Sequence, residues 1–363
     1  MQSPGCDTIA IVDYQQLGNT GVFVSRICLG AMTFGGSGSI YQVIGGLPQS
    51  DADKLVGDCI DAGVNFFDTA NVYAIGESET MLAKALGARR KDAVVASKVF
   101  GRMGQGPNQV GLSRLHIMQA VEGSLARMNT DYIDLYQIHG FDSLTPLEET
   151  LGALTDLVRQ GKVRYIGCSN LAAWQIMKSL GISALGHLEK FVTLQAYYSL
   201  AGRDLERELV PMLLDQKMGL LVWSPLAGGF LSGKFTRDGA SDNEARRSKF
   251  SFPPVNLEKA YGIIDAMQAV AKRRNATVAQ VAIGWLLHQP SVTSVIIGAK
   301  NAGQLKDNLG SVELKLDAED LKQLDEVSRL TPEYPGWMLA GQGSDRRPGQ
   351  VRDWSRFTVA KAP

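Results

Sequence analysis

Four polar side chains, each at or just past the end of an apolar run, are the residues of this sequence best suited to chemistry. Asp68 closes the run FFD, and Tyr73 lies in the loop that follows it. Lys98 lies near the end of VVASKV, and His139 closes IDLYQIH. In a parallel α/β fold the C-terminal ends of the strands meet on one face, where ligands bind. We therefore expect a carboxylate, a phenol, an ammonium and an imidazole at one site.

Together these residue types suit proton transfer to or from an oxygen atom. A phenol has an unperturbed pKa of about 10 and is a poor acid at neutral pH. A nearby ammonium, Lys98, would lower the pKa of Tyr73, and Asp68 would keep the buried lysine charged. Neutral His139 could orient a carbonyl oxygen above Tyr73. General acid help of this kind contributes roughly 10²–10⁴-fold to a rate.

Each residue has a plainer interpretation when it is taken alone. An Asp after a strand is more often a cap or a turn former, a loop Tyr is usually a packing group, and a strand-end Lys is usually solvated. The occurrence of all four at strand ends of one predicted fold favours the shared site.

The rest of the chain has a repeating organisation that would hold these residues on one face. Short apolar strands alternate with helical segments in eight units, which favours a (β/α)8 TIM barrel of the α/β class over an open doubly wound sheet. The predicted strands are Ile27–Ala31, Phe66–Thr69, Val94–Val99, Ile133–His139, Tyr165–Ser169, Thr193–Tyr197, Leu220–Ser224 and Val292–Ile297. The predicted helices are Ala52–Ala62, Glu77–Leu86, Arg114–Met128, Pro146–Arg159, Ala172–Leu180, Leu205–Gln216, Leu257–Arg274 and Ala302–Leu309.

Segments outside the repeat complete the predicted fold. Tyr14–Ser25 indicates a β-hairpin with its turn at GNTG, placed to plug the bottom of the barrel. Asp317–Val327 indicates an extra amphipathic helix, and the tail from Leu330 is expected to return over the barrel mouth. The long connections 33–50, 100–113 and 235–256 all follow strands, so they should cluster beside the four polar groups. We expect one domain over residues 1–363.

Composition excludes several classes of partner. Lys+Arg and Asp+Glu both number 37, and no basic run is interleaved with aromatic residues, which argues against nucleic acid or an anionic membrane as a partner. The four cysteines are scattered without metal-ligand spacing, so we expect no metal and no disulfide frame. The N-terminus lacks a signal-peptide pattern and no window reaches transmembrane length. We expect a soluble cytoplasmic protein, and the sequence leaves open whether it forms an oligomer.

Three segments resemble motifs of the aldo-keto reductase superfamily, and the resemblance covers nearly the whole chain. They are GVNFFDTA at 63–70, IDLYQIH at 133–139 and GKVRYIGCSN at 161–170. The chain is most similar to the branch that includes potassium-channel β-subunits and many bacterial reductases. The resemblance implies NADP(H)-dependent interconversion of aldehydes or ketones and alcohols by the tetrad Asp68, Tyr73, Lys98 and His139, with Tyr73 as general acid or base.

The resemblance also implies which residues would hold NADP(H). Ser169, Asn170 and Gln195 would hydrogen-bond the nicotinamide carboxamide, and Trp223 would replace the tyrosine that many members stack on that ring. The segment 223–234 resembles a pyrophosphate loop, whose small residues admit backbone amides to phosphate and whose Lys234 adds charge. The remaining implied positions in and around these loops are Thr33, Asp68, Ser224, Pro225, Leu226, Gly228, Leu231, Gly233 and Gly298. An ordinary flexible loop is the alternative for the glycines.

Lys300 lies in the segment IGAKN before a helix, where related chains carry Arg or Lys for the 2′-phosphate of NADP. Gln304 and Asn308 match the adenine contacts. The alternative is a lysine that only solvates a helix start. Because Lys lacks the planar fork of Arg, the preference for NADP could be weaker than usual.

The substrate is inferred from the tail and two loops. Phe100 and Phe141 are expected to face Trp337 across an apolar pocket, with Tyr334, Trp354 and Phe357 nearby in the tail. The alternative is a tail that packs on the outside of the barrel or in a subunit interface. The tail segment TPEYPGW and the segments AYYSL and QIHGFD resemble bacterial members that act on bulky secondary alcohols and ketones, and trichothecene mycotoxins are one such candidate class.

Two other functions compete with a reductase of small-molecule carbonyls or alcohols. A cofactor-bound regulatory subunit resembling the channel β-subunits would keep the same tetrad, so turnover of carbonyls is what separates the two. A barrel enzyme of different chemistry, such as a lyase, would be favoured by a failure to bind NADPH.

Overall fold

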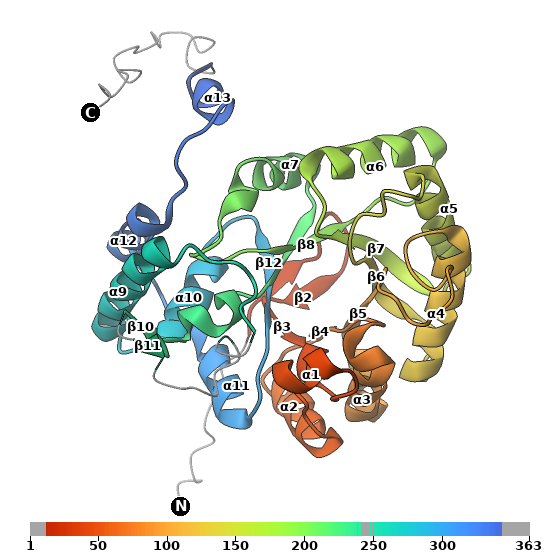
Figure 1. Cartoon of the computed structure of the whole chain (residues 1–363), viewed down its shortest axis with the longest axis horizontal. Helices are drawn as coiled ribbons and strands as arrows, with labels where there is room; N and C mark the ends of the chain where they lie inside the picture. The colour runs from red at the N-terminus through yellow and green to blue at the C-terminus, as the bar shows by residue number, and fades with distance from the viewer. Residues whose placement is uncertain (1–11, 238, 241–246, 248–249, 343–363) are drawn as a thin grey trace, which may run out of the picture. The chain divides into compact units, whose positions relative to one another are not determined.

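Eight parallel strands form a closed barrel in the order β12-β3-β4-β5-β6-β7-β8-β9 (Figure 1). The computed structural model describes residues 12–237, 239–240, 247 and 250–342. The barrel strands are β3 (Ile27–Gly30), β4 (Phe66–Asp68), β5 (Val94–Val99), β6 (Ile133–Ile138), β7 (Val163–Ser169), β8 (Thr193–Tyr197), β9 (Gly219–Trp223) and β12 (Val292–Ile297). All six residues of β12 are buried, as expected for a parallel sheet covered on both faces. The predicted (β/α)8 barrel is confirmed.

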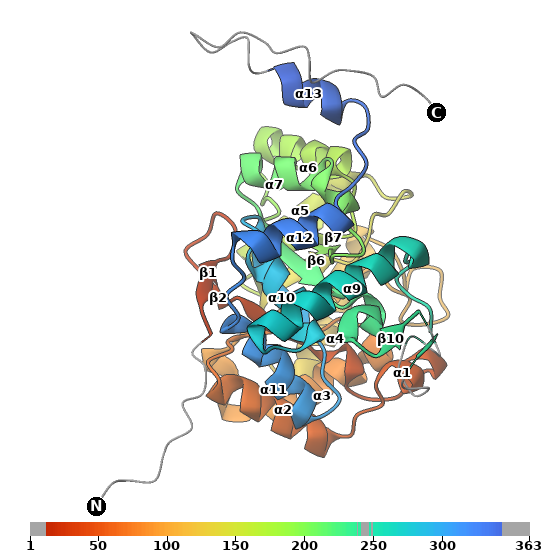
Figure 2. The ribbon, with the colours of Figure 1, turned by 90° about the vertical axis from the view of Figure 1, so that its left-hand side faces the viewer.

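Helices surround the barrel and bury their apolar faces against its outer side (Figures 1 and 2). They are α2 (Gln49–Asp61), α3 (Glu77–Leu86), α4 (Arg114–Met128), α5 (Leu147–Arg159), α6 (Ala173–Gly186), α7 (Leu209–Gln216), α9 (Leu257–Arg274), α10 (Val278–Leu287), α11 (Ala302–Leu309) and α12 (Ala318–Ser328). Short 3-10 turns are η1 (Ala31–Thr33), η2 (Tyr73–Gly76), η3 (Gly87–Asp92), η4 (Asp204–Glu206), η5 (Ala227–Ser232) and η6 (Gly310–Val312). In the predicted span 205–216, η4 and α7 replace one continuous helix.

The hairpin of β1 (Tyr14–Gln16) and β2 (Phe23–Ser25) closes the end of the barrel where the strands begin. Leu17 and Val24 are fully buried and pack with Phe66 and Leu135 inside the barrel. Figure 2 shows this hairpin at one end of the barrel and helix α1 (Ser39–Ile44) with β10 (Phe235–Thr236) at the other. Strand β10 pairs with β11 (Gly239–Ala240). The predicted hairpin is confirmed, and the opposite end stays available for a site.

Three of the described helices, α1, α10 and α13 (Gly336–Gln342), were not predicted. Helix α10 has no polar face, because nearly all of its residues are apolar and buried, so it lacks the periodicity that marks a surface helix. Its signal is at the start, where Thr277 and Gln280 form a capping box. Helix α1 lies in the span 33–50, which the sequence presented only as a long connection. Among the described residues, no helix is long and apolar enough to cross a membrane.

The chain divides into two compact units, Met1–Ser328 and Arg329–Pro363. In the second unit, helix α13 (Gly336–Gln342) carries Trp337, whose ring meets Tyr334 edge to face at a centroid distance of 6.1 Å. Both side chains are exposed. Trp354 and Phe357 lie outside the described residues. The position of the tail over the barrel mouth and a single domain over residues 1–363 stay predictions.

Candidate active site

The ammonium of Lys98 brings three of the four predicted residues together. Its Nζ donates to Asp68 Oδ1 at 2.5 Å, to the carbonyl oxygen of Thr69 at 2.8 Å and to Tyr73 Oη at 3.3 Å. Asp68 ends β4 and Lys98 lies on the neighbouring β5, so the strand register alone places both at the mouth of the barrel. The three donor positions of one ammonium are thereby directed at a carboxylate, a carbonyl and the phenol.

Burial and charge act in opposite directions on Lys98, whose side chain is inaccessible to solvent. Burial alone would lower the pKa of Lys98, but the Asp68 carboxylate and Tyr73 outweigh it, and the pKa is raised above its usual value. Lys98 is therefore a cation at neutral pH, held 3.3 Å from the phenol oxygen. A cation in that place stabilises the phenolate that remains after Tyr73 gives up its proton.

The second carboxylate oxygen of Asp68 has partners that the sequence analysis did not foresee. Gln195 Nε2 donates to Asp68 Oδ2 at 2.8 Å, and Gln137 Nε2 donates to the same oxygen at 3.3 Å. Two amides and one ammonium thus hold a carboxylate that is only 3% exposed. Gln195, implied by resemblance to contact nicotinamide, directs its Nε2 at Asp68, and its contact with nicotinamide stays a prediction.

The turn that carries Tyr73 has an unusual backbone. Ala74 and Ile75 have φ of 46° and 55°, and Gly76 has φ of 90°, so three consecutive residues occupy the left-handed region. A Cβ on Gly76 would lie 2.5 Å from Cδ of Arg127, so only glycine fits beneath that side chain. The turn is compact enough to return Tyr73 toward Lys98 before α3 begins.

A buried carboxylate joins this turn to the strand of Lys98. Glu79 in α3 is fully buried, and its oxygens accept from Ser97 Oγ at 2.5 Å and from Arg127 Nε at 2.6 Å. Ser97 immediately precedes Lys98 on β5. Helix α3, which follows the turn of Tyr73, is therefore fastened to the strand of Lys98 by a hydrogen bond and to α4 by an ion pair.

His139 is the fourth residue, and it is held in the neutral form. Burial, with help from the Lys98 cation, lowers the pKa of His139 to about 3. Its ring meets the ring of Tyr73 edge to face at a centroid distance of 5.6 Å. Its carbonyl oxygen accepts from Asn170 Nδ2 at 3.1 Å. A neutral imidazole beside the phenol can orient a carbonyl oxygen without adding a second positive charge.

The depressed pKa of His139 predicts a loss of stability in acid. The unfolded chain takes up a proton as the pH falls through about 6.5, whereas the folded chain does so only near pH 3, so unfolding becomes more favourable between those values. At pH 5 this costs about 2 kcal/mol. We expect His139→Gln to flatten the dependence of the unfolding free energy on pH by that amount, measured by urea unfolding at pH 7 and pH 5.

The matched control for that measurement is His187, an exposed histidine at the C-cap of α6. His187→Asn suits its φ of 50°, because Asn tolerates the left-handed region. The control should keep the wild-type pH dependence. Equal slopes for His139→Gln and wild type would contradict the assignment of a neutral, buried His139.

The residues implied to hold the nicotinamide lie on the same face. Ser169 ends β7, and its Oγ is buried without a hydrogen-bond partner among the described residues; the same holds for Thr33 Oγ1 at the end of η1. Buried hydroxyls of this kind are rare unless a ligand or water completes them. These two hydroxyls therefore fit a bound cofactor, which would complete their hydrogen bonds.

Asn170 and Trp223 are already paired with each other. Trp223 Nε1 donates to Asn170 Oδ1 at 3.0 Å, and Asn170 adopts a φ of 60°. The Trp223 ring stacks with Phe252 at a centroid distance of 5.8 Å and meets Tyr197 at 5.1 Å. The indole is thus fixed by two aromatic neighbours and a hydrogen bond, at the end of β9.

The loop 224–234 has the conformation of a backbone cradle. Gly228, Gly229 and Gly233 have positive φ, and Ser224 Oγ accepts from the amide of Gly228 at 2.8 Å. A Cβ on Gly228 would lie 2.2 Å from the carbonyl oxygen of Phe252, so the loop is closely packed against the following segment. This arrangement supports fixed backbone amides rather than an ordinary flexible loop. The implied Pro225, Leu226, Leu231 and Lys234 lie in this same loop.

The segment 298–308 lies beyond the end of β12, next to β3 and β9. Asn301 caps α11 by accepting from Gln304 N at 2.9 Å. Gln304 Oε1 accepts from Lys300 N at 2.9 Å, and Asn308 Nδ2 donates to the carbonyl oxygen of Gly298 at 3.1 Å. Gln304 and Asn308, the residues implied to contact adenine, therefore also hold the turn that carries Lys300.

A family comparison agrees with this geometry. Residues 26–329 match the family model described as aldo/keto reductase family, which is most of the chain. This chain belongs to the aldo/keto reductase family. It is thus a member of a family of oxidoreductases built on the TIM barrel.

Curated relatives align over nearly the full length of this aldo/keto reductase. An uncharacterized oxidoreductase, YrpG, of Bacillus subtilis is 36% identical over 90% of this chain and 100% of its own length. Versiconal hemiacetal acetate reductase of Aspergillus parasiticus is 34% identical over 90% of this chain and 99% of its own length. A probable voltage-gated potassium channel subunit beta of Oryza sativa subsp. japonica is 36% identical over 89% of this chain and 94% of its own length.

Of the three residues predicted to line the substrate pocket, Phe100 and Phe141 lie in the first unit of the chain. Phe100 follows β5 and Phe141 follows the neighbouring β6, and the Phe100 ring lies 3.8 Å from where a Cβ on Gly140 would stand, directly after His139. Phe141 contacts Trp174 edge to face at a centroid distance of 6.1 Å. Trp337 belongs to the second unit of the chain, and its place in the pocket stays a prediction.

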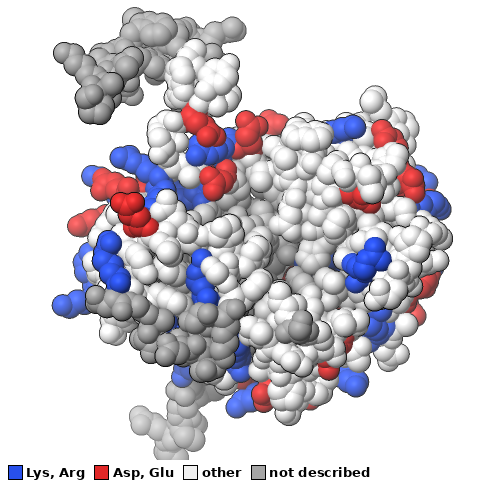
Figure 3. All heavy atoms as spheres, in the orientation of Figure 1, with Lys and Arg blue, Asp and Glu red and all other residues white. Residues whose placement is uncertain are grey.

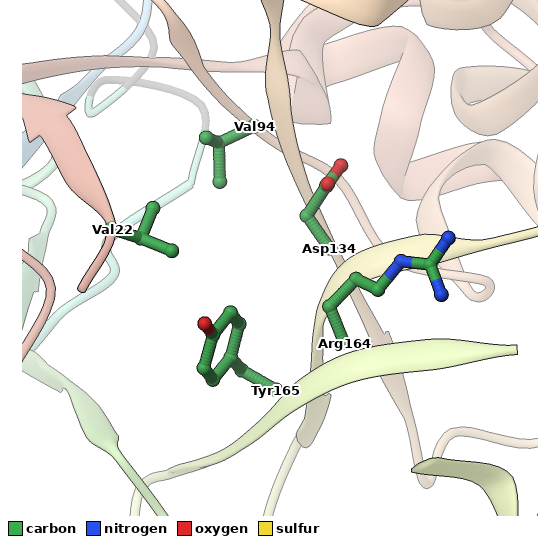
Figure 4. Close-up of a pocket in the computed structure, with 5 residues that line it drawn as sticks. All are labelled: Val22, Val94, Asp134, Arg164 and Tyr165. Carbon is green, nitrogen blue, oxygen red and sulfur yellow. The ribbon is translucent and has the colours of Figure 1, made fainter. Parts of the chain in front are cut away.

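Each end of the barrel has a hollow, and the two hollows differ in the side chains that border them. On the face viewed in Figure 1, charged side chains gather toward the rim, and the hollow near the centre is bordered mainly by uncharged atoms (Figure 3). A second hollow lies at the opposite end, where Val22, Val94, Asp134, Arg164 and Tyr165 line the gap between the hairpin and the strand starts (Figure 4). It is remote from the tetrad, because Val94 and Asp134 lie at the starts of β5 and β6, whereas Lys98 lies near the end of β5 and His139 directly follows β6. Among the described residues, no cluster of His, Cys, Asp and Glu could hold a metal ion.

Proposed function

We propose that this aldo/keto reductase is an NADP(H)-dependent enzyme that interconverts aldehydes or ketones and the matching alcohols. The observation that carries the proposal is the buried ammonium of Lys98, which contacts both Asp68 and Tyr73 at the mouth of the barrel. We further propose that it acts in the cytoplasm, as the buried, unpaired thiols of Cys28, Cys59 and Cys168 favour.

When bound, NADP(H) would provide the hydride for carbonyl reduction, and NADP⁺ would take it up in alcohol oxidation. Tyr73 gives its phenolic proton to the carbonyl oxygen during reduction and takes it back during oxidation. Lys98 stabilises the phenolate, and Asp68 keeps Lys98 charged and in place. Neutral His139 orients the substrate oxygen beside the phenol. Ser169 and Thr33, with their buried hydroxyls, would contribute to holding the cofactor.

The direct test is a screen of aldehydes and ketones with the full chain and NADPH, followed by absorbance at the NADPH band. The proposal predicts oxidation of NADPH that depends on both enzyme and substrate. A chain that binds NADPH but turns over no carbonyl would favour the alternative, a cofactor-bound regulatory subunit. The identity of 36% with the probable rice channel subunit supports that alternative. A chain that binds no NADPH would favour a barrel enzyme of another chemistry.

Lys300 is proposed to select NADP(H) over NAD(H). NAD lacks the 2′-phosphate, so NADPH should bind more tightly than NADH to the wild type. Lys300→Ala should narrow that difference by roughly 1.5–3 kcal/mol, the range for hydrogen bonds to charged groups. Dissociation constants of both cofactors, measured by fluorescence titration, check this prediction.

Lys306→Ala is the matched control, because Lys306 is an exposed lysine in the last turn of α11, the helix that Lys300 precedes. It should leave the preference for NADPH unchanged. Equal affinities of the wild type for NADPH and NADH would refute the role of Lys300.

For the substrate we propose bulky secondary alcohols and the matching ketones, with trichothecene mycotoxins as a candidate class. The uncharged hollow on the face of the tetrad supports weakly polar substrates (Figure 3). A relative that is 34% identical to this chain is named versiconal hemiacetal acetate reductase, after a hemiacetal acetate as substrate. Phe100, Phe141 and Trp337 are the proposed apolar walls.

A further inference from the structure

Helix α1 lies on a connection that is firmly attached to the barrel. Gly35 N donates to the carbonyl oxygen of Leu47 at 3.0 Å, and Leu47 N donates to that of Thr33 at 3.1 Å, so the two ends of the connection pair like strands. A Cβ on Gly45 would lie 2.3 Å from the carbonyl oxygen of Thr33, a contact that only glycine permits. The helix between these ends is thereby kept close to η1.

A second attachment ties α1 to the turn of Tyr73. The carboxylate of Glu77 accepts from the backbone amides of Gly36 and Ser37 at 3.0 and 3.1 Å. The hydrogen bond from Ser37 is the main reason that the pKa of Glu77 is lowered, so the carboxylate is ionised at neutral pH. Glu77 is the first residue of α3, directly after the turn. Helix α1 is therefore fixed relative to Tyr73.

This arrangement places the ring of Tyr41 beside the proposed proton donor. The rings of Tyr41 and Tyr73 lie 6.3 Å apart between centroids, with 57° between their planes. The ring of His139 also contacts the ring of Tyr73. Burial, and then the charge of Tyr73, raise the pKa of Tyr41 to about 12, so Tyr41 is a neutral phenol at all working pH values. Its ring offers an apolar face with one polar tip.

The surroundings of Tyr41 are apolar and exposed. Ile40, Val43 and Ile75 are 41%, 37% and 61% exposed, on α1 and on the Tyr73 turn. Ile75 Cδ1 lies 3.7 Å from where a Cβ on Gly38 would stand, so the turn and the start of α1 are in contact. Ile40 and Val43 of α1, together with Ile75 two residues after Tyr73, thus leave in water branched apolar side chains that suit an apolar ligand.

We propose that α1 forms a wall of the substrate pocket and that Tyr41 is a specificity-determining residue, which packs against an aromatic or cyclic apolar group attached to the carbonyl carbon. This inference rests on the proposed function and names a substrate class for it. Tyr41 selects flat or cyclic apolar carbonyl compounds over short aliphatic ones, because a ring makes stacking or edge contacts with Tyr41 that a short chain cannot make.

The test compares 2-naphthaldehyde with propanal as substrates for wild type and Tyr41→Ala with NADPH. The ratio of kcat/KM for 2-naphthaldehyde to that for propanal should fall about tenfold in Tyr41→Ala, because apolar burial and an aromatic contact are both lost. Tyr41→Phe keeps the ring and should restore most of the ratio. Tyr14→Ala, which removes a tyrosine from the hairpin at the opposite end of the barrel, should leave the ratio unchanged and controls for a loss of stability.

Binding separates a failure of this inference from a failure of the proposed function. The dissociation constant of 2-naphthylmethanol for the NADP⁺ complex, measured by calorimetry, should rise about tenfold in Tyr41→Ala whether or not the enzyme turns over. An unchanged constant together with an unchanged kcat/KM ratio would overturn the role of Tyr41. Weaker binding by Tyr41→Ala, together with no turnover by the wild type, would support the role of Tyr41 and refute only the reductase activity.

Discussion

Replacing Tyr73 by phenylalanine is expected to reduce turnover by roughly 10²–10⁴-fold, the range for losing a general acid. The variant keeps the aromatic ring beside His139 and Tyr41 and removes only the hydroxyl that receives a hydrogen bond from Lys98. Lys98 retains Asp68 and the carbonyl oxygen of Thr69 as partners, so the buried cation stays compensated. Affinity for NADPH should therefore change little, and steady-state kinetics with a fluorescence titration measure both quantities.

Tyr14→Phe supplies the matched control for this loss of a hydroxyl. Tyr14 Oη donates to the carbonyl oxygen of Gly63 at 2.7 Å, on the hairpin at the opposite end of the barrel. The control should retain wild-type turnover. A Tyr73→Phe enzyme with more than a tenth of wild-type turnover would rule out Tyr73 as the proton donor.

Much of the barrel could be predicted because local sequence signals, such as helix caps and apolar runs, agree with the pattern of buried residues. The predicted bounds of α3, α4, α9 and α11 match those in the structure, and the last three begin at Ser113, Asn256 and Asn301, whose side chains cap them. Strand β9 is recognisable because parallel strands inside a barrel are continuous apolar runs. The predicted ends of β4 and β6 lie one residue beyond those in the structure, at Thr69 and His139, whose amides still bond to the neighbouring strand.

The proximity of the four tetrad residues could be predicted from strand order, but the residues that hold them in place could not. Asp68, Lys98 and His139 are strand-end residues, so a barrel brings them together once the order is known. Gln137 and Glu79 carry no such signal: their roles depend on side-chain direction and on which strand or helix lies beside them, and the spacing of residues in a sequence does not encode either.

The role of α1 was missed for a related reason. Its six residues are too few for a helical period to stand out, and the preceding glycines indicate a loop. What fixes its position is the long-range contact between Glu77 and the amides of Gly36 and Ser37. The proximity of Tyr41 to Tyr73 is thus a property of the tertiary structure alone.

Replacing Lys98 by methionine is expected to affect both stability and turnover. Methionine preserves most of the volume of the side chain but removes the charge that compensates Asp68, which stays buried with only two amide donors. Breaking a buried ion pair by removing one partner typically costs about 3–5 kcal/mol of unfolding free energy. Turnover should fall by about 10²-fold or more, because the phenolate of Tyr73 loses its cation. Urea unfolding and steady-state kinetics measure the two effects separately.

The double variant Asp68→Asn with Lys98→Met distinguishes loss of charge compensation from loss of chemistry. Both buried charges are removed, and replacing a buried ion pair by neutral groups is often close to neutral for stability. The double variant should therefore recover most of the unfolding free energy that Lys98→Met loses, while its turnover stays as low, since Tyr73 still lacks the ammonium. Recovery of turnover together with stability would show that Lys98 serves the fold and not the proton transfer. A single Lys98→Met variant that is fully active would show that Lys98 and Tyr73 are not coupled at all.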